Sequence, residues 1–161
     1  TALPTALPWA TWESKELGVS VMYPATCHPE PIQGWWQCVD AGKWQMAVGV
    51  FDRADHPEEW GLMMGPGKIR ASGLIQMMVH ALDMSLEEDF VLITDTPIID
   101  RPGLDGWNAR YRERSYLGAA RAVEVIILKS DNREWIFAFM EGDGGYRGWT
   151  DRAQTSIKLV H

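Results

Sequence analysis

Motifs that would assign an activity are missing from this chain of 161 residues. It contains no Gly-Lys-Ser/Thr and no Rossmann fingerprint, so neither type of nucleotide site is predicted. Its histidines show no HxxxH or HExxH spacing, and no nucleophile is marked beside a base. Because catalysis needs such a constellation, we predict that the chain is not an enzyme and that it carries no cofactor.

Long apolar runs and basic residues are also scarce. No uninterrupted apolar stretch approaches the roughly 18–20 residues of a membrane-spanning helix, so no transmembrane segment is predicted. The chain has 15 Lys and Arg against 22 Asp and Glu, which gives a net charge of -7 and a pI near 5.0. Nucleic acid and anionic membranes are also negatively charged and would repel this chain, so neither is an expected partner.

Cysteine is limited to Cys27 and Cys38. Their spacing is not CxxC, so no zinc site is predicted, and no other metal site is marked. In an oxidising compartment the two could pair, which would stabilise the fold by roughly 3 kcal/mol in the chain-entropy model. In the cytosol they would remain two buried thiols. Both interpretations stay open with the compartment, for which an exported location (periplasmic or lipoprotein) is preferred to a cytoplasmic one.

The residues that are present describe one globular domain. Hydrophobic residues make up 46% of the chain, enough for one solid core at this length. Residues 1–10 repeat Thr-Ala-Leu-Pro and are predicted to form a flexible N-terminal arm ahead of a single domain over residues 11–161. Nine tryptophans favour either an aromatic-rich core or an exposed binding surface.

Alternating residues predict strands in the first part of the domain. A strand over residues 17–23 is followed by a proline-rich loop over residues 25–33. Residues 35–40 and 44–52 are predicted to form a hairpin around a turn that contains Gly42.

The hairpin register follows from that turn. With Asp40 opposite Lys43, Trp35 would lie opposite Val48, and Trp36 would point to the other face of the sheet from Val48.

Helical periodicity follows, and strands then dominate. A short helix is predicted to begin at Asp55, and a second one covers residues 72–84. Four further strands are predicted over residues 90–96, 107–116, 121–129 and 134–141. A C-terminal helix is predicted over residues 146–160. Lys129 is expected opposite Glu134.

Both faces of the hairpin over residues 121–141 are apolar. One face carries Val123, Val125, Ile127, Ile136, Ala138 and Met140, and the other carries Glu124, Ile126, Leu128, Trp135, Phe137 and Phe139. A sheet with one wet face would alternate apolar with polar residues. These strands are therefore expected to be covered on both sides, by helices, by the N-terminal arm or by a partner.

Three segments carry a resemblance to a known family. The strand LGVSVMYPA at residues 17–25, the turn at 98–109 that leads into a long strand, and the closing SIKL at 156–159 resemble the PsbP-like superfamily. That group includes extrinsic proteins of the photosynthetic oxygen-evolving complex, a Ran-binding transport factor and many uncharacterised bacterial domains, and this chain is most similar to the last type. The chain departs from the pattern at Cys27-His28, where such domains often have a tryptophan.

The resemblance implies a fold class and, by analogy only, a role. It implies an α+β domain in which an antiparallel sheet of about six strands forms an α/β/α sandwich with a C-terminal helix. It implies a non-enzymatic binding or assembly role, although a fold does not fix a function. No metal-binding or partner-binding residue is carried over from the family.

Candidate binding residues come from the strand over residues 107–116. Arg110, Arg112 and Arg114 alternate along it and so share one face, where three guanidinium groups could bind a phosphate, a carboxylate or an acidic protein. The alternative, which we favour, is a solvated strand face on which Glu124 pairs with Arg110 or Arg112.

Two function hypotheses follow. The first is a binding or assembly module with a protein partner, which uses either the arginines or a surface of exposed aromatics formed by Trp35, Trp36 and Trp44. The second is a small-ligand carrier, or an enzyme, with an apolar pocket between sheet and helix. The oligomeric state is left open.

Overall fold

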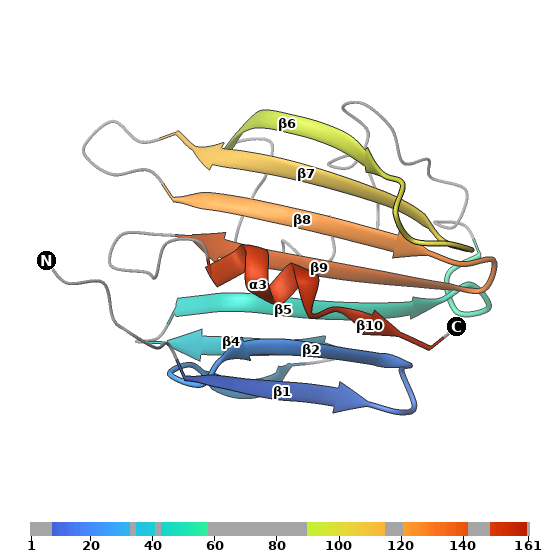
Figure 1. The fold of residues 1–161 in the computed structure, drawn as a ribbon, viewed down its shortest axis with the longest axis horizontal. Coiled ribbons are helices and arrows are strands. Elements are labelled where there is room, and N and C mark those ends of the chain that lie inside the picture. Colours follow the sequence, from blue (N-terminus) through green and yellow to red (C-terminus); the bar gives the residue numbers. More distant parts are fainter. Residues whose placement is uncertain are drawn as a thin grey trace, which may run out of the picture.

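The computed structural model describes residues 8–32, 35–40, 43–57, 90–114, 121–141 and 149–160. Within these segments, ten strands form two antiparallel sheets, and one short helix lies beside them (Figure 1). The smaller sheet has the strand order β1-β2-β10, and the larger sheet has the order β3-β4-β5-β9-β8-β7-β6.

The smaller sheet contains β1 (Trp9–Ser14), β2 (Val19–Pro24) and β10 (Lys158–Leu159). The larger sheet contains β3 (His28–Ile32), β4 (Trp35–Asp40), β5 (Lys43–Asp52), β6 (Phe90–Ile98), β7 (Asp105–Glu113), β8 (Ala122–Lys129) and β9 (Arg133–Glu141). The helix is α3 (Trp149–Thr155). The described residues include no helix that is long and apolar enough to cross a membrane.

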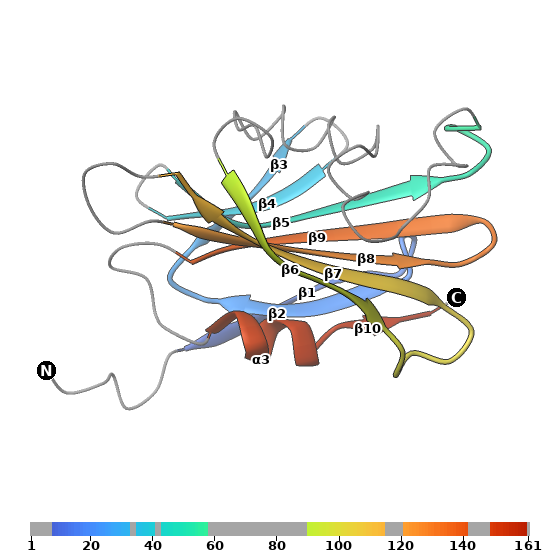
Figure 2. The same cartoon turned by 90° about the horizontal axis from the view of Figure 1, so that it is seen from above.

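The predicted α/β/α sandwich with about six strands is wrong. The described residues are mostly strand, and a second sheet with one short helix packs on one face of a seven-stranded sheet (Figure 2). The second sheet forms because β1 pairs along the length of β2, and residues 158–159 pair with the other edge of β2. The described residues 53–57 form turns, so no helix begins at Asp55, and the rest of the two helices predicted before β6 falls on residues 58–89, which lie outside the described residues.

The predicted loop over residues 25–33 contains a strand instead. β3 pairs antiparallel with β4 and forms one edge of the larger sheet. Its prolines, Pro29 and Pro31, are two residues apart, so their missing N–H groups fall on the same side of the strand. At an edge, that side faces away from the hydrogen-bonded ladder, and proline is tolerated there.

The register of the β4–β5 hairpin is correct at the turn and shifts beyond it. Asp40 lies opposite Lys43 as predicted, but an irregularity after Cys38 places Trp36 opposite Val48. One extra residue in a strand exchanges the faces of all residues beyond it. Trp36 therefore shares a buried cluster with Val48, whereas the predicted register separated them.

The β8–β9 hairpin has the predicted register, with Lys129 opposite Glu134. Its side chains enter two buried clusters, one on each face of the larger sheet. Exposures of 5% for Ile126, 1% for Trp135 and 0% for Phe137 show that the face toward α3 is dry. The prediction that neither face of this hairpin is open to solvent is confirmed.

The smaller sheet and α3 cover only part of that face. In Figure 1, β1 and β2 lie in front of β4 and α3 lies in front of β9, while β6 and β7 extend beyond them. The predicted C-terminal helix ends at Thr155 rather than at residue 160, because residues 158–159 pair with β2. The strands β6, β7 and β8 are left beside the helix without a second sheet over them.

Candidate functional site

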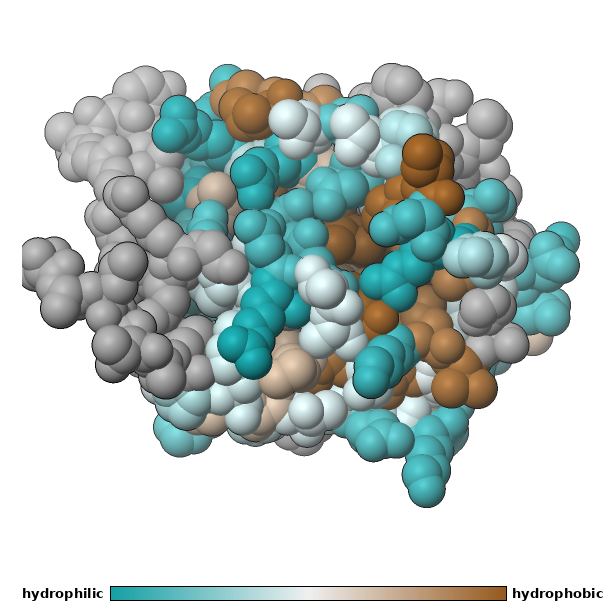
Figure 3. All heavy atoms as spheres, viewed as in Figure 1, coloured by the Kyte–Doolittle hydropathy of each residue, from teal (hydrophilic) through white to brown (hydrophobic). Residues whose placement is uncertain are grey.

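A groove of about 910 Å³ lies between α3 and the strands β6, β7 and β8. Figure 3 shows a hollow in this face, with apolar atoms at its floor and polar atoms around it. We call it the α3 groove. The side chains of its lining that are used below are Thr94, Thr96 and Ile98 of β6, Asn108 and Arg110 of β7, Glu124, Ile126 and Leu128 of β8, and Gln154 and Ile157 at α3.

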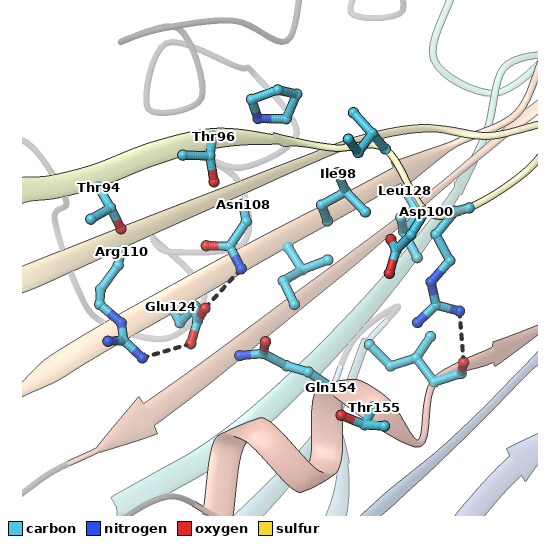
Figure 4. A pocket seen from close by; sticks show the side chains of 15 residues that line it. Thr94, Thr96, Ile98, Asp100, Asn108, Arg110, Glu124, Leu128, Gln154 and Thr155 are labelled. Atoms are coloured by element: carbon cyan, nitrogen blue, oxygen red, sulfur yellow. Dashed lines mark hydrogen bonds and ion pairs between the residues drawn. The ribbon is translucent and has the colours of Figure 1, made fainter.

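Strand alternation places the polar groups of the groove together. Asn108 and Arg110 share one face of β7, and Arg110 lies directly opposite Glu124 of β8. Figure 4 shows these three side chains at one end of the groove, joined by hydrogen bonds.

The Glu124 carboxylate is fully partnered. It is buried, with 8% exposure, and it accepts a hydrogen bond of 2.7 Å from Asn108 Nδ2 at one oxygen and one of 3.4 Å from the Arg110 guanidinium at the other. A buried charge needs such compensation. Because each oxygen accepts a hydrogen bond, the carboxylate of Glu124 is held in place by Asn108 and Arg110.

Gln154 supplies an unused donor from the opposite wall. Its Nε2 is buried and has no hydrogen-bond acceptor among the described residues. In Figure 4 the side chain extends from α3 toward the Glu124 end of the groove. A buried donor without an acceptor costs about 1–3 kcal/mol, so an acceptor on a bound molecule would relieve that cost.

The floor of the other end of the groove is apolar, and Asp100 also lines that end (Figure 4). Its floor consists of Ile126, Leu128 and Ile157, which are at most 5% exposed. There the Arg101 guanidinium donates a hydrogen bond of 2.8 Å to the Ile157 carbonyl, which ties the turn after β6 to the end of α3. The groove therefore runs from the Asn108, Arg110 and Glu124 end to an end with an aliphatic floor and the charged side chains of Asp100 and Arg101.

The predicted arginine row continues from the polar end. Arg110, with 44% side-chain exposure, pairs with Glu124, while Arg112 and Arg114 are exposed and have no acidic partner among the described residues. The carboxylate of Glu113 between them is held by Arg121 at 2.6 Å. β7 ends at Glu113 rather than at residue 116, so Arg112 lies on the strand and Arg114 directly follows it.

Comparison with known proteins identifies the fold. No family model matches the chain, and no curated protein matches it. The solution structure of cyanobacterial PsbP (CyanoP) from Synechocystis sp. PCC 6803 matches with a TM-score of 0.56 and 11% identity, over 96% of this chain and 94% of that one. The chain has a PsbP-like fold. This confirms the resemblance at the level of fold.

Within this PsbP-like fold, Trp36 is a core residue. It is 8% exposed, stacks on Trp12 with ring centroids 5.1 Å apart, and meets the edge of Tyr23 at 5.2 Å. The side chains of Trp35 and Trp44 lie outside the described residues. Trp36 therefore does not contribute to an exposed aromatic surface, because the shift in β4 turns it beneath the smaller sheet.

The two cysteines lie away from the groove. Cys27 and Cys38 are joined by a disulfide with a Cα–Cα distance of 5.5 Å, and they are 3% and 0% exposed. The bond ties the residue before β3 to β4 beneath the smaller sheet. It belongs to the core rather than to the site.

Sequence reasoning did not identify Asn108 and Gln154 as site residues. The alternation that grouped the arginines also places Asn108 on their face, so that signal was present. Nothing in the sequence indicates that α3 packs against β2 and β9, and the position of Gln154 depends on that packing. No group of three or more His, Cys, Asp or Glu side chains that could hold a metal is present among the described residues.

Proposed function

We propose that this chain is a non-enzymatic binding module and that its ligand lies in the α3 groove. The observation that carries this proposal is the buried, unpartnered Nε2 of Gln154, opposite a carboxylate whose oxygens are both occupied. The groove thus offers a donor to a bound molecule, and its buried carboxylate, Glu124, already accepts hydrogen bonds at both oxygens. A likeness to CyanoP supports the fold and leaves the choice of ligand to the groove itself.

A protein partner suits the groove better than a small molecule does. The groove is open along the strands and continues into the exposed Arg112 and Arg114, so its surface extends beyond a single pocket. Open surfaces with a polar rim are typical of protein contacts.

A small-ligand carrier is the second candidate. The groove volume of about 910 Å³ lies within the range of roughly 300–1,000 Å³ of ligand pockets. The large aromatic side chains of β9, Trp135 and Phe137, are buried beneath the smaller sheet and do not line this groove.

The test compares a blocked groove with an equally altered surface. Thr96 is exposed and lines the groove, so Thr96→Trp fills it with little disturbance of the core, and Thr11→Trp makes the same change on an exposed position of β1. Binding of a panel of peptides, fatty acids and metabolites is measured by the rise in Tm. Ligands bound by the wild type and by Thr11→Trp should be lost in Thr96→Trp. A panel without binders, or binders indifferent to Thr96→Trp, would contradict the proposal.

A further inference from the structure

We infer that the α3 groove and the arginine row together bind one extended acidic segment of a partner protein. This inference rests on the proposed function and adds to it the class of the partner and the way in which it lies.

The basic charge is local. The protein has a net charge of -7, yet Arg110 and Arg112 stand on one face of β7, and Arg114 follows directly after that strand. Arg110 forms an ion pair of 3.4 Å with Glu124, whereas Arg112 and Arg114 have no acidic partner among the described residues. An anionic partner is complementary to such a row, and an acidic surface elsewhere would disfavour binding at other places.

The spacing of the arginines distinguishes a peptide from a free anion. Side chains two residues apart on a strand lie roughly 6.5–7 Å from one another. An extended peptide that lies over the face of the sheet, along β7, presents every second side chain toward the sheet at that same spacing. Acidic residues at positions i and i+2 can therefore meet Arg112 and Arg114 at once, and guanidinium binds carboxylate in a fork geometry.

The polarity of the groove sets the rest of the segment. Beyond Arg110, the floor becomes aliphatic at Ile126 and Leu128, which follow Glu124 on the same face of β8. An aliphatic side chain of the peptide fits there. The Nε2 of Gln154, between the two ends, can donate to a backbone carbonyl of the peptide.

Selection from a random peptide-display library tests the pattern without presupposing a sequence. The bait is the intact protein, and the double variant Arg112→Gln/Arg114→Gln serves for counter-selection. Enriched peptides should carry Asp or Glu two residues apart and an aliphatic residue a few positions to one side. Enrichment without acidic residues, or of the same peptides by both baits, would overturn the inference.

The best enriched peptide is then titrated by fluorescence anisotropy. Because an exposed ion pair contributes about 0.2–1 kcal/mol, loss of two pairs should weaken binding by about two- to thirtyfold. The control Lys15→Gln/Arg53→Gln removes the same charge from exposed positions elsewhere. It should change the affinity less than twofold, because no ion pair with the peptide is lost. Equal losses in the two double variants would mean that net charge alone drives binding, which overturns the inference.

Two further outcomes separate this inference from the proposed function. A peptide with the same composition but adjacent acids should bind more weakly, and equal binding would exclude the extended register. Inorganic phosphate should compete only as its ionic strength predicts, and stronger competition would reassign the row to free anions. If ligands of the panel are blocked by Thr96→Trp while no acidic peptide binds, the groove is a binding site and the inference about its partner is wrong.

Discussion

Gly18, in the turn between β1 and β2, has a backbone conformation that other residues rarely adopt. Its φ is +65°, and a Cβ at this position would lie 2.5 Å from the carbonyl oxygen of Val160. The Gly18 carbonyl in turn accepts a hydrogen bond of 2.9 Å from the Val160 amide. The residue thus needs both a left-handed backbone and a close approach of the C-terminal segment.

Gly18→Ala is therefore expected to lower the free energy of unfolding by about 1–3 kcal/mol. Urea unfolding measures the change. Glu16→Ala, at an exposed position of the same turn, is the control and should stay within about 0.5 kcal/mol of the wild type. Equal stability of Gly18→Ala and the wild type would mean that the C-terminal segment does not lie against Gly18.

Glu134 links stability to pH. Burial raises the pKa of its carboxyl above the ordinary 4.5, and Lys129, opposite it on β8, lowers that pKa in part. The folded protein therefore keeps this proton to a higher pH than the unfolded chain does. The free energy of unfolding falls as the pH rises between the two pKa values, and it stays lower above them.

Glu134→Gln should remove this fall. Relative to the wild type, the variant should gain free energy of unfolding from acidic to neutral pH, as measured by urea unfolding across that range. Glu13→Gln, at an exposed position, is the control. If the difference in the free energy of unfolding between the wild type and Glu134→Gln is the same at every pH, the carboxyl of Glu134 has the same pKa in the folded and the unfolded protein.

Among the elements, β3 is held by a covalent bond as well as by its ladder. It is an edge strand with two prolines, and the Cys27–Cys38 disulfide joins its start to β4. Replacement of both cysteines by alanine is expected to cost about 2–4 kcal/mol, because the unfolded chain loses a crosslink. Since both residues are at most 3% exposed, the bond should also resist reductant until the protein unfolds. Free thiols in denatured, unreduced protein would contradict the pairing.

Elements with a local origin could be predicted from the sequence, and those with distant partners could not. The β8–β9 hairpin was found because a short turn between two apolar segments fixes Lys129 opposite Glu134. The irregularity after Cys38 left no mark in the sequence, and it changed the face of Trp36. β10 is two residues long, too short for any periodic signal, yet its pairing with β2 helps to create the second sheet. The same reasoning explains the site: the arginines follow from alternation within β7, whereas Gln154 depends on the docking of α3.

At the scale of the whole molecule, the two sheets differ in how well their strands are buried and paired. β8 and β9 are central strands with buried side chains on both faces, whereas β10 contributes two residue pairs at the edge of the smaller sheet. Amides of central, doubly buried strands exchange only through global unfolding, while edge segments open with a smaller free energy. Native-state hydrogen exchange should therefore give the full free energy of unfolding for Ile127 and Phe137 and a lower value for the Val160 amide, which is bonded to Gly18. A groove ligand should raise the lower value, since α3 joins β10 directly. Identical exchange energies at all three amides would show instead that both sheets and the helix open as one cooperative unit.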